Sequence, residues 1–202
     1  KRLSASVDLA GLGGNTNFYK PMLEAVWYLK QANRITLGMR AQYEYIHQFT
    51  GSKELPIFEK LFLGGEYSVR GFDIRSIGPT VPNSQIVLGG NKSLLFNGEY
   101  IITVAGPVRL VLFFDAGQVR DFGQKFGWKE DLTRVVVPPP PLLVDPFAGL
   151  GFGGLEDPNA PGVHTEVIGQ TNAFKTSTGA EIRFFMPVLN VPFRLIYASN
   201  PS

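Results

Sequence analysis

The sequence predicts an all-β fold, an antiparallel barrel that crosses a membrane with its strands. Three observations predict it. Seven stretches alternate apolar and polar residues with a period of two, which is the period of a β-strand. Between its first and last apolar residue, one face of every stretch carries no charge. Short turns alternate with long connections along the chain, as in up-and-down membrane barrels.

The seven predicted strands follow directly from the alternation. The clearest lies at 34–45, where Ile35 and Leu37 point to one side and Arg34 and Thr36 to the other. Most of the stretches are 9–14 residues long, which matches the length of a tilted strand that crosses a bilayer. The full set is 1–9, 21–30, 34–45, 93–105, 108–119, 173–186 and 192–199.

The second face of these strands is the reason for predicting a membrane barrel rather than a soluble sandwich. A sandwich also alternates apolar and polar residues, but it does not usually place so many charges, with Gly and Thr between them, along long strands. A barrel in lipid presents only apolar side chains outward and encloses a wet lumen. The charged residues predicted to face the lumen are Arg2, Asp8, Glu24, Arg34, Arg40, Glu44, Glu99, Arg109, Asp115, Glu181, Arg183 and Arg194.

The connections predict an orientation. Short turns at 31–33, 106–107 and 187–191 alternate with longer connections at 10–18, 47–92 and 120–173. In outer-membrane barrels the short turns are periplasmic and the long loops extracellular. Tyr and Trp gather at the two membrane interfaces, and the predicted girdle residues are Trp27, Tyr28, Tyr43, Tyr45, Tyr100 and Tyr197.

The composition argues against several classes of function. The formal net charge is only +2, which gives no reason to expect a nucleic-acid partner. There is no Cys, and His47 and His164 show neither a catalytic pattern nor a metal-ligand spacing. We therefore expect no enzyme activity, no metal and no cofactor. No apolar run is long enough for a transmembrane helix.

Seven strands are too few for a closed barrel of this kind. Single-chain bacterial barrels have an even number of strands, eight or more. An open sheet in lipid leaves unpaired backbone groups along both edges. We therefore expect this sequence, 1–202, to be part of a larger barrel, with further strands before Lys1 and at least one after Ser202. Its open edges would allow the isolated piece to associate with itself.

The connection at 47–92 carries the most distinctive stretch, 64–79, with the sequence GGEYSVRGFDIRSIGP. Its four glycines give the backbone freedom for tight turns, and Pro79 closes the segment. This composition favours a folded tongue over a slack linker. The alternative is a surface loop with one solvated Arg.

The stretch from Leu63 to Phe72, which contains Val69-Arg70-Gly71-Phe72, resembles the signature loop of BamA-type outer-membrane assembly proteins. The segments that follow fit the same family: a Gly-Gly-Asn start at 89–91, a strand carrying Glu99, and Phe-Asp-Ala-Gly at 114–117. The resemblance covers essentially the whole chain. It implies a barrel of sixteen strands preceded by POTRA domains, with this chain supplying strands nine to fifteen. The last strand, which forms one side of the lateral gate, would then lie outside it.

The resemblance also implies a role for the loop. It would fold back into the lumen, where Arg70 pairs with carboxylates that match Glu99 and Asp115. The alternation independently places both carboxylates on the lumen face. A planar guanidinium can bind two carboxylates with charge-assisted hydrogen bonds. Arg70 could pin the loop and do nothing more, or the pinned loop could take part in function. An acid–base role for the two carboxylates fits less well beside an Arg.

The implied function is the folding and insertion of β-barrel proteins into the bacterial outer membrane. The partners would be outer-membrane lipid, unfolded outer-membrane protein clients and accessory lipoproteins. The alternatives are a related translocation or secretion pore, TamA-like or of the two-partner type, a passive porin-like channel, and a soluble β-sandwich. The apolar, Pro-rich stretch 135–144 is predicted to pack as a lid over the barrel mouth, or else to contact a partner protein.

Overall fold

The structure is a computed structural model. It describes residues 1–11, 16–49, 55–81, 84, 86–136, 164–186 and 191–201. These residues form strands, turns and bends. No helix among them is both long enough and apolar enough to cross a membrane.

Ten strands are defined in this part of the chain, and they lie in two sheets. Their bounds are β1 Arg2–Ala10, β2 Phe18–Ala32, β3 Ile35–Tyr45, β4 His47–Gln48, β5 Lys92–Ala105, β6 Val108–Arg120, β7 Lys129–Val136, β8 His164–Asn172, β9 Lys175–Met186 and β10 Val191–Ser199.

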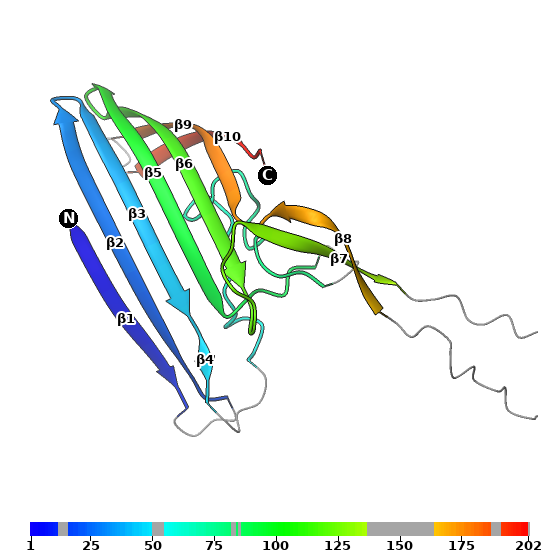
Figure 1. Ribbon diagram of the computed structural model, residues 1–202. Coiled ribbons are helices and arrows are strands. Elements are labelled where there is room, and N and C mark those ends of the chain that lie inside the picture. Colours follow the sequence, from blue (N-terminus) through cyan, green and yellow to red (C-terminus); the bar gives the residue numbers. More distant parts are fainter. Residues whose placement is uncertain are drawn as a thin grey trace, which may run out of the picture.

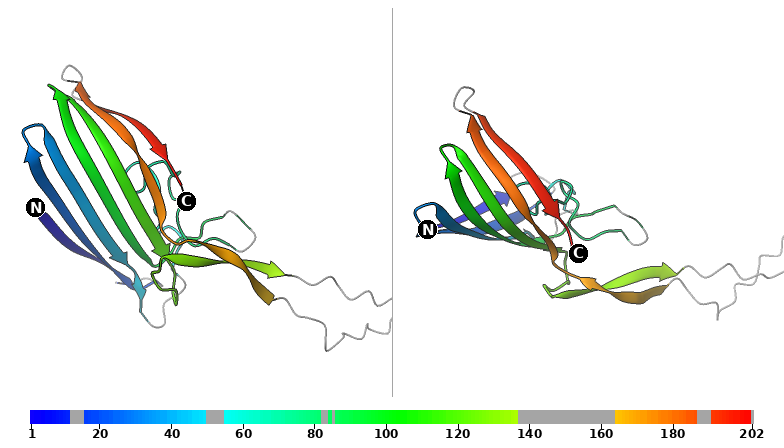
Figure 2. Two further views of the ribbon diagram at one scale, coloured as in Figure 1. Left: turned by 45° about the horizontal axis from the view of Figure 1, so that its top comes forward. Right: turned by 90° about the horizontal axis from the view of Figure 1, so that it is seen from above.

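The larger sheet runs in the order β1-β2-β3-β5-β6-β9-β10, and every neighbouring pair is antiparallel. The short strand β4 pairs with the beginning of β2. The sheet curves like part of a barrel wall, with the β2–β3 and β5–β6 turns at one end (Figures 1 and 2). The predicted all-β, antiparallel fold is confirmed, and the seven predicted stretches are the seven long strands of this sheet. As far as the chain is described, the wall does not close, and β1 and β10 are its two ends.

The register keeps the two faces of the sheet separate. In one row Trp27 pairs with Met39, Met39 with Gly98, and Gly98 with Phe114. These positions belong to the face predicted to contact lipid, and large apolar side chains are exposed along it. They include Leu3, Val7, Leu9, Leu23, Leu29, Phe96, Leu112, Ile182, Phe193 and Leu195. An apolar face that remains exposed on every strand is the pattern that a lipid environment requires.

The predicted aromatic girdle contains one error. Tyr28 lies on the lumen face, in register with Gly38 and Glu99. Its ring packs over Gly38, where an added Cβ would be 3.1 Å from the ring. Tyr28 therefore fills the space left by a missing side chain on the lumen wall and is not an interfacial anchor.

The second long connection contains an element that the sequence reading missed. Strands β7 and β8 pair as an antiparallel hairpin, separate from the main sheet. The hairpin extends away from the barrel wall (Figure 1). Of the Pro-rich stretch 135–144, Val135 and Val136 belong to β7, and 137–144 lie outside the described residues. The prediction that this stretch packs as a lid over the barrel mouth therefore stays a prediction.

Candidate functional site

In the connection between β4 and β5, the described residues 55–81 and 86–91 are folded and lie on the concave side of the sheet (Figure 2). We call residues 49–91 the lumen loop. Isolated bridges join Leu61 to Gly90, Leu63 to Ile77 and Thr80 to Val87, so the loop doubles back on itself. This is the folded tongue that its Gly-rich composition predicts.

A small apolar core holds the lumen loop against the wall. Leu61, Leu63, Val69 and Ile77 from the loop are buried together with wall residues such as Leu95. Val69 is completely buried, and Phe72 packs against the same cluster. Each side chain of this size stabilises the packed loop by about 1.5–3 kcal/mol when it is fully buried. The lumen loop is therefore an integral part of the fold.

Arg70 forms the polar centre of the site. Its Nε and Nη2 donate to the two carboxylate oxygens of Asp115 on β6, each at 2.7 Å. Its backbone N–H donates to the same carboxylate at 3.1 Å. Arg70 is 3% exposed and Asp115 is fully buried. A bidentate, charge-assisted pair of this kind fixes both the position and the orientation of the guanidinium.

Two more carboxylates complete the set of Arg70 acceptors. Its Nη1 donates to Glu99 on β5 and to Glu181 on β9, both at 2.9 Å. The guanidinium also lies over the ring of Phe113, 3.8 Å from its centroid. Four hydrogen bonds thus join the guanidinium to acceptors from three neighbouring strands, while an aromatic ring covers its plane.

Arginines on the wall neutralise the rest of this charge. Arg183 pairs with Glu99 at 2.6 Å and with Glu181 at 2.8 Å. Arg194 on β10 donates to Glu181 as well. The network then contains three arginines and three carboxylates, so its formal charge is zero, and its centre of Arg70, Asp115 and Glu181 is buried. A buried ionic cluster is tolerated when every charge is matched in this way.

The electrostatic surroundings keep Arg70 charged. Burial by itself lowers the pKa of its guanidinium, but the hydrogen bonds and negative charges of Asp115, Glu99 and Glu181 outweigh burial. The pKa of Arg70 is therefore raised above its ordinary value. Loss of a proton from Arg70 therefore does not switch off its ion pairs with the three carboxylates.

Close packing next to Arg70 requires a glycine at position 71. Its φ is +82°, a region that side chains rarely adopt. A Cβ at this position would be 2.5 Å from Oδ1 of Asn200 and 2.7 Å from the Cβ of Ala198. Asn200, just after β10, in turn donates to the carbonyl of Gly71. The missing side chain lets the lumen loop approach the last described strand.

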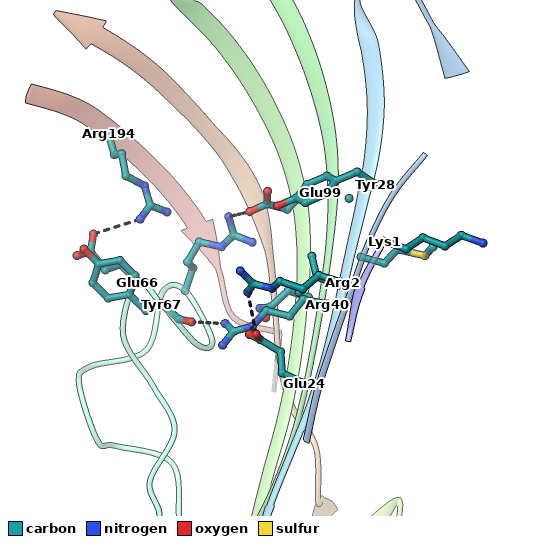
Figure 3. A pocket seen from close by; sticks show the side chains of 14 residues that line it. Lys1, Arg2, Glu24, Tyr28, Arg40, Glu66, Tyr67, Glu99 and Arg194 are labelled. Atoms are coloured by element: carbon teal, nitrogen blue, oxygen red, sulfur yellow. Dashed lines mark hydrogen bonds and ion pairs between the residues drawn. The ribbon is translucent and has the colours of Figure 1, made fainter. Parts of the chain in front are cut away.

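A second anchor holds the lumen loop on the opposite side, toward β1–β3 (Figure 3). Nη1 of Arg40 donates to the carbonyl of Tyr67 at 3.1 Å. Glu24 on β2 pairs with Arg40 at 2.7 Å and with Arg2 on β1 at 2.8 Å. A cavity of about 440 Å³ lies between this chain of charges and the loop.

The two anchors together connect one loop to every strand of the main sheet path. The second anchor reaches β1, β2 and β3, and Arg70 reaches β5, β6 and β9. Strand β10 is reached through Arg194, whose Nη1 lies 3.8 Å from Glu66. The lumen loop therefore acts as an internal brace across the whole described wall.

The sequence reading located the centre of this site but not all of its members. The structure brings Arg70, Glu99 and Asp115 together as the family resemblance implies, with Val69 and Phe72 packed beside them. It adds Glu181, Arg183 and Arg194, which the alternation places on the charged face without linking them to Arg70. The available signal was that shared face, since Glu181 lies on it as Glu99 and Asp115 do.

Comparison with known proteins gives the family. The sequence profile of the Omp85 superfamily domain matches residues 2–201. This chain belongs to the Omp85 superfamily. That match covers the strands, the lumen loop and the hairpin alike.

Individual relatives agree with this assignment. The chain is 32% identical over 127 residues to an outer membrane protein assembly factor BamA from Nitratidesulfovibrio vulgaris, and 30% identical over 124 residues to the BamA of Neisseria meningitidis serogroup B. These matches cover 62% and 57% of this chain but only 16% of either relative. A SAM50-like protein of Schizosaccharomyces pombe is 27% identical over 122 residues, which cover 55% of this chain and 25% of that protein.

A solved structure supports the fold independently. The chain superposes on the crystal structure of BamA from Haemophilus ducreyi lacking POTRA domains 1–3 with a TM-score of 0.66. The match covers 99% of this chain and 35% of that one, at 22% sequence identity. At this identity the superposition establishes a shared barrel-wall fold.

Proposed function

We propose that this chain is part of an outer-membrane assembly factor that folds and inserts β-barrel proteins. It lies in the bacterial outer membrane, with its apolar face in contact with lipid. Its clients are unfolded outer-membrane proteins, and accessory lipoproteins assist it. The work requires no catalytic residue, metal or cofactor, because the product is a set of strand pairings and not a new covalent bond.

The observation that carries this proposal is the braced lumen loop in a chain about 30% identical to two assembly factors named BamA. A loop clamped into the lumen by a buried, neutral ionic network obstructs free passage, which argues against a passive channel. The same brace stiffens the described wall. A stiff wall favours local opening at a seam elsewhere in the barrel over collapse of the whole structure.

The proposed mechanism is strand addition at that seam. An open strand edge presents unpaired N–H and C=O groups, and a client strand can pair with them. In lipid each unpaired backbone group is costly, so the pairing itself drives insertion. The role of the lumen loop is to hold the remaining wall in register while the seam exchanges partners.

Reconstitution of the full-length native protein in liposomes tests the proposal. An unfolded outer-membrane barrel is added as client, and its insertion is followed by protease protection. We expect insertion by the native protein, strong loss with Arg70→Ala, and full activity with Arg134→Ala, a matched loss of one arginine on the hairpin. Liposomes that gain ion conductance but insert no client would show a channel and contradict the proposal.

A further inference from the structure

The end of the wall that carries the short turns has an uneven charge distribution. Beyond the register row of Glu181, the lumen face carries Arg109, Arg183 and Arg194, and Arg34 lies in the turn between β2 and β3, where its carbonyl accepts from the N–H of Thr103. We call these four residues the arginine rim. No Asp or Glu occurs in this band, which consists of 31–35, 102–110, 182–186 and 191–195, and residues 187–190, which lie outside the described residues, have the uncharged sequence PVLN.

The rim arginines are direct neighbours. Arg109 on β6 pairs in register with Arg183 on β9, and Arg183 pairs with Arg194 on β10. Like charges opposite each other in an antiparallel pair are destabilising. Arg183 and Arg194 relieve part of this repulsion by reaching toward Glu181 and Glu99. Those two carboxylates already serve Arg70, so they leave no negative charge for the rest of the rim.

Arg34 and Arg109 are the unmatched members. Both are exposed, and neither forms an ion pair with any residue that the structure describes. Lys30, also exposed, lies one register row further into the lumen and adds a third such cation. Lys30 and Arg109 lie on the lumen face of β2 and β6, in alternation with Tyr28 and Asp115, and Arg34 lies in the turn that follows β2.

We infer that the arginine rim is a docking surface for an acidic polypeptide segment that approaches the lumen from the short-turn side. Charge complementarity selects this partner, because Arg34 and Arg109 are exposed without an ion pair among the described residues, and the band around them carries no Asp or Glu. Guanidinium forks bind the carboxylates of Asp and Glu in bidentate fashion. The inference stands independently of the proposed assembly function.

The test uses the full-length native protein in nanodiscs of phosphatidylcholine and a fluorescent peptide rich in Asp and Glu. Binding is followed by fluorescence anisotropy, with a peptide in which Asn and Gln replace the acids as reference. We expect saturable binding of the acidic peptide that weakens steeply with salt. The double variant Arg34→Gln, Arg109→Gln should bind about tenfold more weakly. Neither residue belongs to the network around Arg70.

The control variant is Lys129→Gln, Arg134→Gln, which removes the same charge from the hairpin and should bind like the native protein. The variant Arg34→Lys, Arg109→Lys keeps the charge and should retain most of the affinity, which excludes a folding defect as the cause. Equal weakening in the control, or unchanged binding in the rim variant, would overturn the inference. So would a rim variant that binds the peptide normally but no longer copurifies with phosphatidylglycerol, because the partner would then be a lipid surface.

Discussion

The two long connections of this wall contrast sharply. The lumen loop turns inward, buries an apolar cluster that includes Leu61, Leu63, Val69 and Ile77, and places one arginine among three carboxylates. The β7–β8 hairpin turns outward and leaves Val167, Ile168 and Leu132 exposed. Its base is held by Gln118, which exchanges hydrogen bonds with the backbone of Gly127, and by an ion pair between Arg120 and Glu130 at 3.0 Å.

The difference teaches that length alone does not decide what a barrel loop does. The lumen loop has matching partners on the wall, since the strands carry Glu99, Asp115 and Glu181 at the depth where Arg70 arrives. The hairpin satisfies its backbone by pairing its two strands with each other. We therefore expect changes in the lumen loop to affect the whole wall and changes in the hairpin to remain local.

The largest effect is expected from Arg70→Ala. Removing this side chain leaves Asp115 and Glu181, both fully buried, with less positive charge around them. Breaking a buried ion pair in this way costs about 3–5 kcal/mol. Urea unfolding of the full-length protein, followed by the gel mobility of the folded barrel, should show the shift. If the urea concentration at the unfolding midpoint equals that of the native protein, the lumen loop does not stabilise the wall more than the hairpin does.

Gly71→Ala should have the next largest effect. The added methyl would meet Asn200 and Ala198 at sub-contact distances, on a backbone with positive φ. Strain of this kind costs about 1–3 kcal/mol. We expect faster proteolysis within the lumen loop while the strands remain protected. Gly123→Ala is the matched control, because Gly123 also has positive φ but has open space around its Cβ position.

Arg40→Met sharpens the comparison within the lumen loop itself. Its side chain is 33% exposed, against 3% for Arg70, so solvent already screens its pairing with Glu24. Partly exposed pairs contribute about 0.2–1 kcal/mol. We expect a small loss of stability and a loop that stays in the lumen. A loss of stability as large as that of Arg70→Ala would mean that Arg40 holds the lumen loop as strongly as Arg70 does.

The smallest effect is expected from shortening the hairpin. Replacing 131–170 by a short Asn-Gly turn removes most of both strands of the small sheet but keeps the ion pair between Arg120 and Glu130, and the Ala173 N–H that donates to the carbonyl of Trp128. The free energy of unfolding should change by less than about 1 kcal/mol. The amount of client inserted should change by less than about twofold. Urea unfolding and the liposome assay measure the two quantities. A large loss in either would show that the hairpin supports the wall.

The sequence predicted the wall well because lipid imposes a simple rule on it. Each strand must alternate, so β3 and its neighbours can be read from their apolar positions. The family motif then located Arg70, Glu99 and Asp115. Both predictions depend on residue types that repeat or stand at a fixed spacing.

The remaining features depend on pairings between distant residues. Glu181 contacts Arg70 only because β9 lies beside β6 in the sheet, although the β7–β8 hairpin separates these two strands in the sequence. Tyr28 was assigned to the girdle because aromatic type alone does not reveal the gap above Gly38. The β7–β8 hairpin was missed because its short strands do not alternate cleanly and mix charged and apolar residues on both sides.

The central claim is that Arg70 and Asp115 stabilise the wall as one unit, and a double-mutant cycle tests it most directly. Unfolding free energies of the full-length protein are measured for Arg70→Ala, Asp115→Ala and the double variant. We predict that the double variant is no less stable than either single variant, because removing both charges leaves neither of them buried without its partner. Single losses that simply add in the double variant would contradict the claim.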